Sequence, residues 1–148
     1  MLRRLAALVM AAILVVAGDA RAQQGTCARQ DFEAAVDDAA ATLRDLNQKH
    51  RPTFQDKLRA LKDKRGWSHD QFLEAAAPYV KDETIIVYDQ KAESLLAEIS
   101  SLGEEGSQAR QPDCALLASL KQRMGALVDI QTEKWRYMFG KLEKALAE

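Results

Sequence analysis

The sequence predicts an all-α protein: an elongated up-down-up antiparallel helical bundle of three long arms, with one disulfide. Apolar residues recur at steps of three or four over residues 30–64, 68–102 and 113–147, which is the spacing of one helix face. Each arm has about 35 residues and as a helix spans on the order of 50 Å. Arms of matched length joined by short turns favour an antiparallel bundle. Two cysteines, one near the start of the first arm and one at the start of the third, complete the pattern.

Residues 1–22 are interpreted as a secretory signal peptide, and residues 23–148 as a single helical-bundle domain. Two arginines precede an apolar run over residues 5–18, and a small-x-small pattern follows it. The run is short for a bilayer span, so an uncleaved anchor helix is the weaker alternative. We expect cleavage between Ala22 and Gln23, a periplasmic or secreted location, and no transmembrane segment in the mature chain.

The mature chain holds two cysteines, Cys27 and Cys114, which are 87 positions apart. In an oxidising compartment an even count of this kind predicts a structural disulfide. Two free thiols or a redox pair are the alternatives, although the chain has no Cys-x-x-Cys motif. Loop-closure entropy assigns a bridge of this span about 4–5 kcal/mol. Because the first and third arms of an up-down-up bundle begin at the same end, the two cysteines can meet there.

The first arm carries an apolar stripe that is interrupted at Pro52. A proline removes one backbone hydrogen bond, so we expect the helix either to kink at Pro52 or to break, with Thr53 capping a new helix. Gly66 follows a basic turn and is expected to end the arm. The stripe consists of Phe32, Val36, Ala39, Leu43, Leu46, Phe54, Leu58 and Leu61.

The second arm opens with a capping box between Ser68 and Gln71, which Trp67 and Phe72 flank as a hydrophobic staple. Pro78 and Asp82 disturb this arm, and it is expected to kink or break near Pro78. Residues 84–88 are β-branched, but they are interpreted as helix because no second strand-like run could pair with them. We expect Gly103 to end the arm, with a polar loop over residues 104–111.

The third arm is expected to start with Asp113 as its N-terminal cap. Its apolar stripe runs to the last residues of the sequence and contains Leu117, Leu120, Met124, Leu127, Trp135, Met138, Leu142 and Leu146. Gly125 and Gly140 lie inside this helix, and each costs up to about 1 kcal/mol relative to alanine.

Seven aromatic residues map to one end of the bundle, the end opposite the disulfide, beside several basic residues of the first arm. This distribution has two interpretations: a surface or pocket for an apolar or anionic partner, or a core of large side chains beside a solvated basic helix end. The opposite end is lined by small alanines and should pack tightly. The candidate partner or ligand surface consists of Phe54, Trp67, Phe72, Tyr79, Trp135, Tyr137 and Phe139.

Catalytic and metal-binding patterns are not found in the sequence, so no enzyme activity and no cofactor are predicted. His50 and His69 are expected at the surface and too far apart to share a metal. The consecutive residues 68–70 (Ser-His-Asp) cannot form a catalytic triad. Without residues 1–22 the net charge changes from −1 to about −3, which does not indicate nucleic acid as a partner.

The sequence therefore favours an exported, non-enzymatic protein that works as an interaction or chaperone-like binding module. The expected partner is another envelope protein or an apolar ligand, and the oligomeric state is left open. Ile86 and Val87 lie beside the apolar stripe of the second arm and would add a partner surface if exposed. The alternative is a carrier of a small apolar ligand or haem-type cofactor, with a pocket at the aromatic end; a haem would be held by Met124 or Met138 and a histidine.

Overall fold

The computed structural model describes residues 27–148, which form four helices and no strand. Their bounds are α1 Arg29–Arg65, α2 His69–Val80, α3 Glu83–Gln108 and α4 Cys114–Ala147. The predictions of an all-α fold and of one disulfide are confirmed, because Cys27 is bonded to Cys114 with the Cα atoms 5.0 Å apart. The expected signal peptide and its cleavage site lie outside the described residues.

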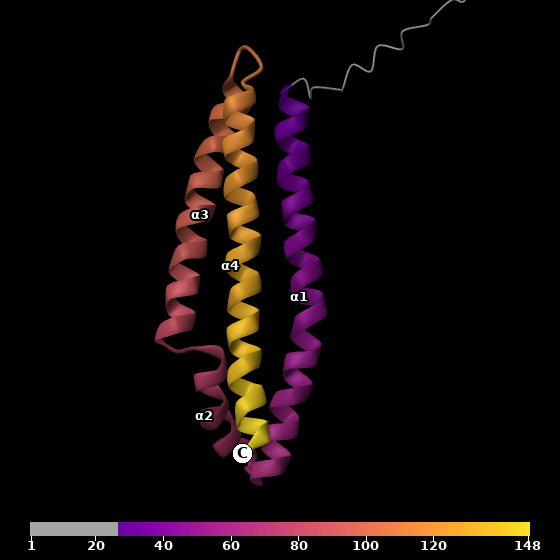
Figure 1. The fold of residues 1–148 in the computed structure, drawn as a ribbon, viewed down its shortest axis with the longest axis vertical. Helices are drawn as coiled ribbons and strands as arrows, with labels where there is room; N and C mark the ends of the chain where they lie inside the picture. Colours follow the sequence, from indigo (N-terminus) through magenta and orange to yellow (C-terminus); the bar gives the residue numbers. More distant parts are fainter. Residues whose placement is uncertain (1–26) are drawn as a thin grey trace, which may run out of the picture.

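The central helix of this elongated molecule is α4 (Figure 1). α1 lies along one side of it, and α3 together with α2 lies along the other. α1 and α4 both begin at the end that carries the disulfide, here called the disulfide end, and both finish at the opposite, distal end. α3 runs back between these ends, and α1 and α3 touch each other far less than each touches α4.

α1 is continuous through Pro52, so of the two outcomes expected there the break, with a new helix capped by Thr53, does not occur. A proline leaves one carbonyl of the preceding turn without its N–H partner. Burial on both sides of Pro52 offsets that loss, since Phe32 and Phe54 face the same central helix. Gly66 ends α1 as expected: its φ of 63° is left-handed, and its N–H donates to the Asp63 carbonyl at 3.2 Å.

The second arm is broken into two helices rather than kinked. The capping box at the start of α2 is confirmed, because Ser68 Oγ accepts the Gln71 N–H at 3.3 Å and Gln71 Oε1 accepts the Ser68 N–H at 2.9 Å. α2 passes through Pro78 and ends at Val80, and Asp82 then caps α3. The apolar stripe changes phase at this point, and the break lets α3 rotate until Ile85 is fully buried.

Two expectations about the end of the second arm are wrong. Gly103 does not end the helix, and most of residues 104–111 is not a loop, because α3 continues to Gln108. The physical reason is packing: Gly106 is buried against the Phe32 ring of α1. The prediction for the next helix is confirmed, since Asp113 Oδ1 accepts the Leu116 N–H at 2.9 Å at the start of α4.

The core consists of two clusters strung along α4. The cluster at the disulfide end contains Cys27, Phe32, Ala35, Leu117, Leu120 and Met124. The distal cluster contains Phe54, Leu58, Leu61, Ile85, Met138 and Leu142. In both clusters α1 and α4 supply most of the buried side chains. α4 is the central helix because it packs against α1 on one side and against α3 on the other.

Candidate functional site

The seven aromatic residues proposed as a surface all belong to the distal cluster or pack against it. Phe54 is only 3% exposed, and the other six are half-buried. The Phe54 ring meets the Phe139 ring edge-on with centroids 5.4 Å apart, and Trp135 lies 5.8 Å and 5.9 Å from these two rings. Edge-on and tilted rings at such distances are the geometry of packed aromatic cores. The structure thus packs Phe54, Trp135 and Phe139 against one another and packs the other four against the distal cluster.

His50 belongs to the same ring network, so the expectation that it lies at the surface is wrong. It is half-buried and stacked on Trp135, with ring centroids 5.5 Å apart. Asn47 Oδ1 accepts the indole N–H of Trp135 at 3.2 Å. The sequence did contain a signal, because His50 lies four residues after Leu46 and four before Phe54 on the apolar face. His69, in contrast, is exposed.

The break between α2 and α3 is tied to α4 through Asp82. Its Oδ1 accepts the Ile85 N–H at 2.8 Å, and its Oδ2 accepts the Tyr137 hydroxyl at 2.8 Å and the Lys141 ammonium. Lys141 also donates to the Pro78 carbonyl at 2.5 Å. Sequence reasoning missed this network, because the partners of Asp82 lie more than fifty positions away on α4.

The pKa of Asp82 records these contacts. Partial burial acts to raise the pKa, but the hydrogen bonds from Lys141, the Ile85 amide and Tyr137, together with the charge of Lys141, lower it from 3.8 to about 2. Asp82 is therefore ionised in the folded protein at neutral pH. We assign it a structural role, because its partners on α3 and α4 hold the α2–α3 junction against α4.

The basic residues at the distal end are used within the fold. Lys64 Nζ donates to the Leu146 carbonyl at 2.5 Å, and Arg65 Nη2 donates to the Ala145 carbonyl at 3.2 Å. The last carbonyls of a helix have no partner inside it, and cations near them are favourable. The end of α1 therefore caps the end of α4, and these two cations are largely engaged.

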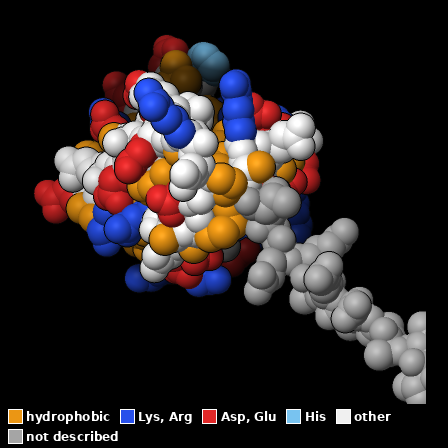
Figure 2. Space-filling view, turned by 90° about the horizontal axis from the view of Figure 1, so that it is seen from above, with side chains coloured by type: hydrophobic (Ala, Val, Ile, Leu, Met, Phe, Trp, Pro, Cys, Tyr) orange, Lys and Arg blue, Asp and Glu red, His pale blue; other side chains and the backbone are white. Residues whose placement is uncertain are grey.

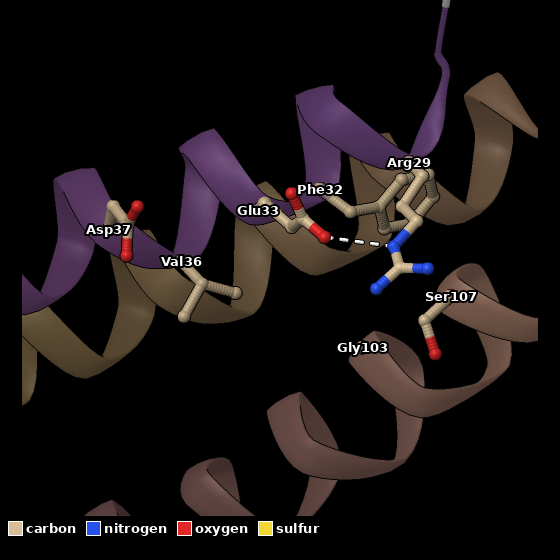
Figure 3. A pocket seen from close by; sticks show the side chains of 7 residues that line it. All are labelled: Arg29, Phe32, Glu33, Val36, Asp37, Gly103 and Ser107. Atoms are coloured by element: carbon tan, nitrogen blue, oxygen red, sulfur yellow. Dashed lines mark hydrogen bonds and ion pairs between the residues drawn. The ribbon is translucent and has the colours of Figure 1, made fainter.

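A groove of about 380 Å³ lies between α1 and α3 near the disulfide end and is here called the α1–α3 groove (Figure 3). Phe32 and Val36 supply its apolar surface from α1, and small residues of α3 leave it open. Arg29 forms an ion pair with Glu33 at 2.8 Å beside it. The lining residues are Arg29, Phe32, Glu33, Val36, Asp37, Gly103 and Ser107.

Viewed from the disulfide end, the molecule shows hydrophobic side chains near its middle and charged side chains around its edge (Figure 2).

A second groove of about 380 Å³ lies at the distal end, between α2 and α4. Of the seven aromatic residues only Tyr79 lines it, beside Pro78, Lys141 and Lys144. Neither groove is a closed pocket among the aromatic rings.

The exposed large hydrophobic side chains are distributed unevenly over the described helices. Five of the six belong to α2 and α3, one belongs to α1, and none belongs to α4. We call the five the outer apolar set: Leu73, Val80, Ile86, Val87 and Leu96. Leu73 is the most exposed of them, at 59%. Ile86 and Val87 are both exposed, and exposure is what they need in order to add a partner surface.

Two further observations concern the part of the chain that the structure describes. It contains no group of three or more His, Cys, Asp and Glu side chains placed to hold a metal ion. None of its helices combines the length and the hydropathy that crossing a bilayer requires.

Comparisons of the chain with protein families, with curated proteins and with solved structures gave no match.

Proposed function

We propose that this protein is an exported, non-enzymatic binding module that holds another envelope protein on the outer side of α2 and α3. The single observation that carries the proposal is the outer apolar set, which gathers on one arm while the central helix exposes no large hydrophobic side chain among the described residues. Exposed hydrophobic side chains scattered singly are ordinary, whereas a concentration of them on one arm favours an interaction surface there.

The size of the outer apolar set suits a reversible contact. Covering one large apolar side chain that is about half exposed contributes roughly 1 kcal/mol. Five such side chains together contribute a few kcal/mol before the cost of association is subtracted. Polar contacts around them must supply the rest, and exposed charges such as Asp89 and Glu93 flank the set on α3.

Two other parts of the proposal rest on the sequence and on the disulfide. A structural disulfide is typical of proteins in oxidising compartments, and the expected signal peptide over residues 1–22 would take the chain there. In this proposal the working form is the three-arm, up-down-up bundle, with the α2–α3 arm turned towards the partner. N-terminal sequencing of the exported protein should then begin at Gln23.

Crosslinking in the native envelope tests the proposed function. A photoreactive residue at Val87 should capture a defined protein, and Ile86→Glu should reduce that capture at least tenfold while leaving the far-UV helical signal unchanged. Gln55→Glu adds the same charge at an exposed position of α1, on the other side of α4, and is the matched control, which should capture normally. Undiminished capture by Ile86→Glu would refute the assignment of the surface.

A second candidate function, a carrier of a small amphipathic ligand, is favoured by the α1–α3 groove. Its volume of about 380 Å³ falls within the range of ligand sites, which is about 300–1,000 Å³. Val36 and Phe32 would contact an apolar tail, and Arg29 would lie near an anionic head group. Mass spectrometry of an organic extract should then find one lipid-like compound that Val36→Glu removes. A visible absorption spectrum tests separately for a haem-type cofactor.

A further inference from the structure

The apolar face of α2 is wider than the part of it that packs on the core. Phe72, Ala76 and Tyr79 face the distal cluster, while Leu73, Ala77 and Val80 form an exposed stripe at positions i, i+4 and i+7. We call these last three residues the α2 stripe. A helix at the surface of a monomer is normally apolar on one side only, and a helix that is apolar all round is normally covered all round. The pattern of α2 indicates that something covers the α2 stripe.

We propose that the α2 stripe is covered by the α2 stripe of a second copy of this chain, with the two helices antiparallel about a two-fold axis at Ala77. The proposal goes beyond the proposed function: it assigns Leu73 and Val80 of the outer apolar set to a second copy and leaves the α3 members of the set to the envelope protein. In this arrangement Leu73 of each copy packs against Val80 of the other. The small side chain of Ala77 lets the two helices approach closely at the axis.

Charge complementarity selects a second copy as the occupant. At 100° per residue, Asp70, Glu74 and Lys81 fall on one flank of the α2 stripe. All three are exposed, and none of them forms an ion pair within residues 27–148. The acidic pair precedes Ala77 and the lysine follows it, so the flank carries opposite charges at its two ends.

An antiparallel two-fold pairing uses this charge order. At 1.5 Å per residue, Lys81 lies about 6 Å beyond Ala77 and Glu74 about 4.5 Å before it. The two-fold axis therefore brings each Lys81 level with Glu74 of the other copy, on the same flank. A parallel two-fold pairing would instead place the charged flanks of the two copies on opposite sides of the contact, where Lys81 could not reach Glu74 of the other copy. The stripe and its flank are thus self-complementary, as an isologous interface requires.

The contact is small, because α2 has 12 residues. Interfaces that bury less than about 1,200 Å² in total belong to weak or transient complexes. We therefore expect a dimer that dissociates on dilution rather than an obligate one. Analytical ultracentrifugation of the purified, disulfide-bonded chain over a dilution series should show a reversible monomer–dimer equilibrium.

Substitutions identify the interface. Leu73→Glu should raise the dissociation constant at least tenfold, whereas Leu96→Glu, at a similarly exposed leucine of α3, should leave it unchanged. Glu74→Lys and Lys81→Glu should each weaken the dimer severalfold, and the double variant should restore it, because the reversed charges pair again. Ala77→Cys should crosslink two copies under mild oxidation, and Ala97→Cys should not.

The outcomes separate this proposal from the proposed function. A chain that stays monomeric at every concentration, or a Leu73→Glu variant that still dimerises normally, overturns the dimer. Failure of the double charge reversal to restore dimerisation overturns the antiparallel register. These measurements use the purified chain alone. If the dimer proposal failed, capture of an envelope protein that Ile86→Glu abolishes would still support the proposed function. If no envelope protein were captured, a measured dimer would still support the dimer proposal.

Discussion

Gly106 provides the sharpest test of the packing between α1 and α3. A Cβ atom at this position would lie 2.3 Å from Cε1, 2.5 Å from Cδ1 and 2.9 Å from Cζ of Phe32. Ordinary contacts begin near 3.4 Å, so the ring has to move by about 1 Å, and Phe32 is only 4% exposed. Gly106→Ala should therefore force Phe32 out of its site and towards the α1–α3 groove.

Two effects of known size oppose each other in this substitution. Alanine in a helix interior is more favourable than glycine by about 1 kcal/mol. Overpacking a buried site costs about 1–3 kcal/mol. We expect Gly106→Ala to be destabilising by up to about 2 kcal/mol, with the helical gain cancelling part of the strain.

Gly103→Ala is the matched control, because it lies one turn earlier in α3 and a Cβ there would meet nothing within 4 Å. It should stabilise the protein by up to about 1 kcal/mol. Urea unfolding followed by circular dichroism gives both free energies of unfolding. In a double-mutant cycle, Phe32→Leu should relieve part of the cost of Gly106→Ala. Equal stabilisation by both alanines would refute the contact between Phe32 and Gly106.

Three further predictions concern other parts of the fold. Asp82→Ala should lower the free energy of unfolding by about 2 kcal/mol at pH 7 but by much less near pH 2. The reason is that folding lowers the pKa of Asp82 from 3.8 to about 2. The carboxylate therefore stabilises the fold above the unfolded pKa, and this stabilisation is lost as the pH falls through 2. Cys27→Ser with Cys114→Ser should lose up to about 4 kcal/mol of unfolding free energy in urea titrations. Asn47→Ala should lose about 1 kcal/mol and shift the fluorescence emission of Trp135, because the indole N–H loses its acceptor.

Each of these predictions has a contradicting result. A loss for Asp82→Ala that is the same at pH 7 and pH 2 would show that the carboxylate charge contributes nothing to folding. Free thiols in protein purified without a reducing agent would contradict the Cys27–Cys114 bond. An Asn47→Ala variant with unchanged emission would show that the indole N–H has no protein acceptor in solution.

Local signals of the sequence correctly predicted much of the fold. Ser68, Asp113 and Gly66 act where short-range hydrogen bonding places them, because a cap needs only residues within one turn. The helical spacing of apolar residues identified the faces that pack on α4. The two cysteines indicated which helix starts meet. These features depend on the chain's own neighbours or on one covalent bond.

The failures occurred where a distant contact outweighs a local preference. Glycine at position 103 was interpreted as a helix end, yet α3 continues because Phe32 packs on Gly106. At Pro52 the sequence left a kink and a break open, and burial on both sides of the proline keeps the helix whole. His50 was placed at the surface by its polarity, although Trp135 covers it.

The sequence by itself determined the all-α class, the helix caps, the faces that become core and the pair of cysteines that bond, because periodicity and capping are read within a few turns of one chain. Only the tertiary structure decided where the second arm breaks, how Asp82 binds α4, and which apolar side chains remain uncovered. The aromatic side chains that marked the distal end as a candidate surface belong to the distal cluster or pack against it, and most of the exposed large hydrophobic side chains lie on α2 and α3. Exposure is a property of neighbours in space, so no spacing along one chain could have assigned it.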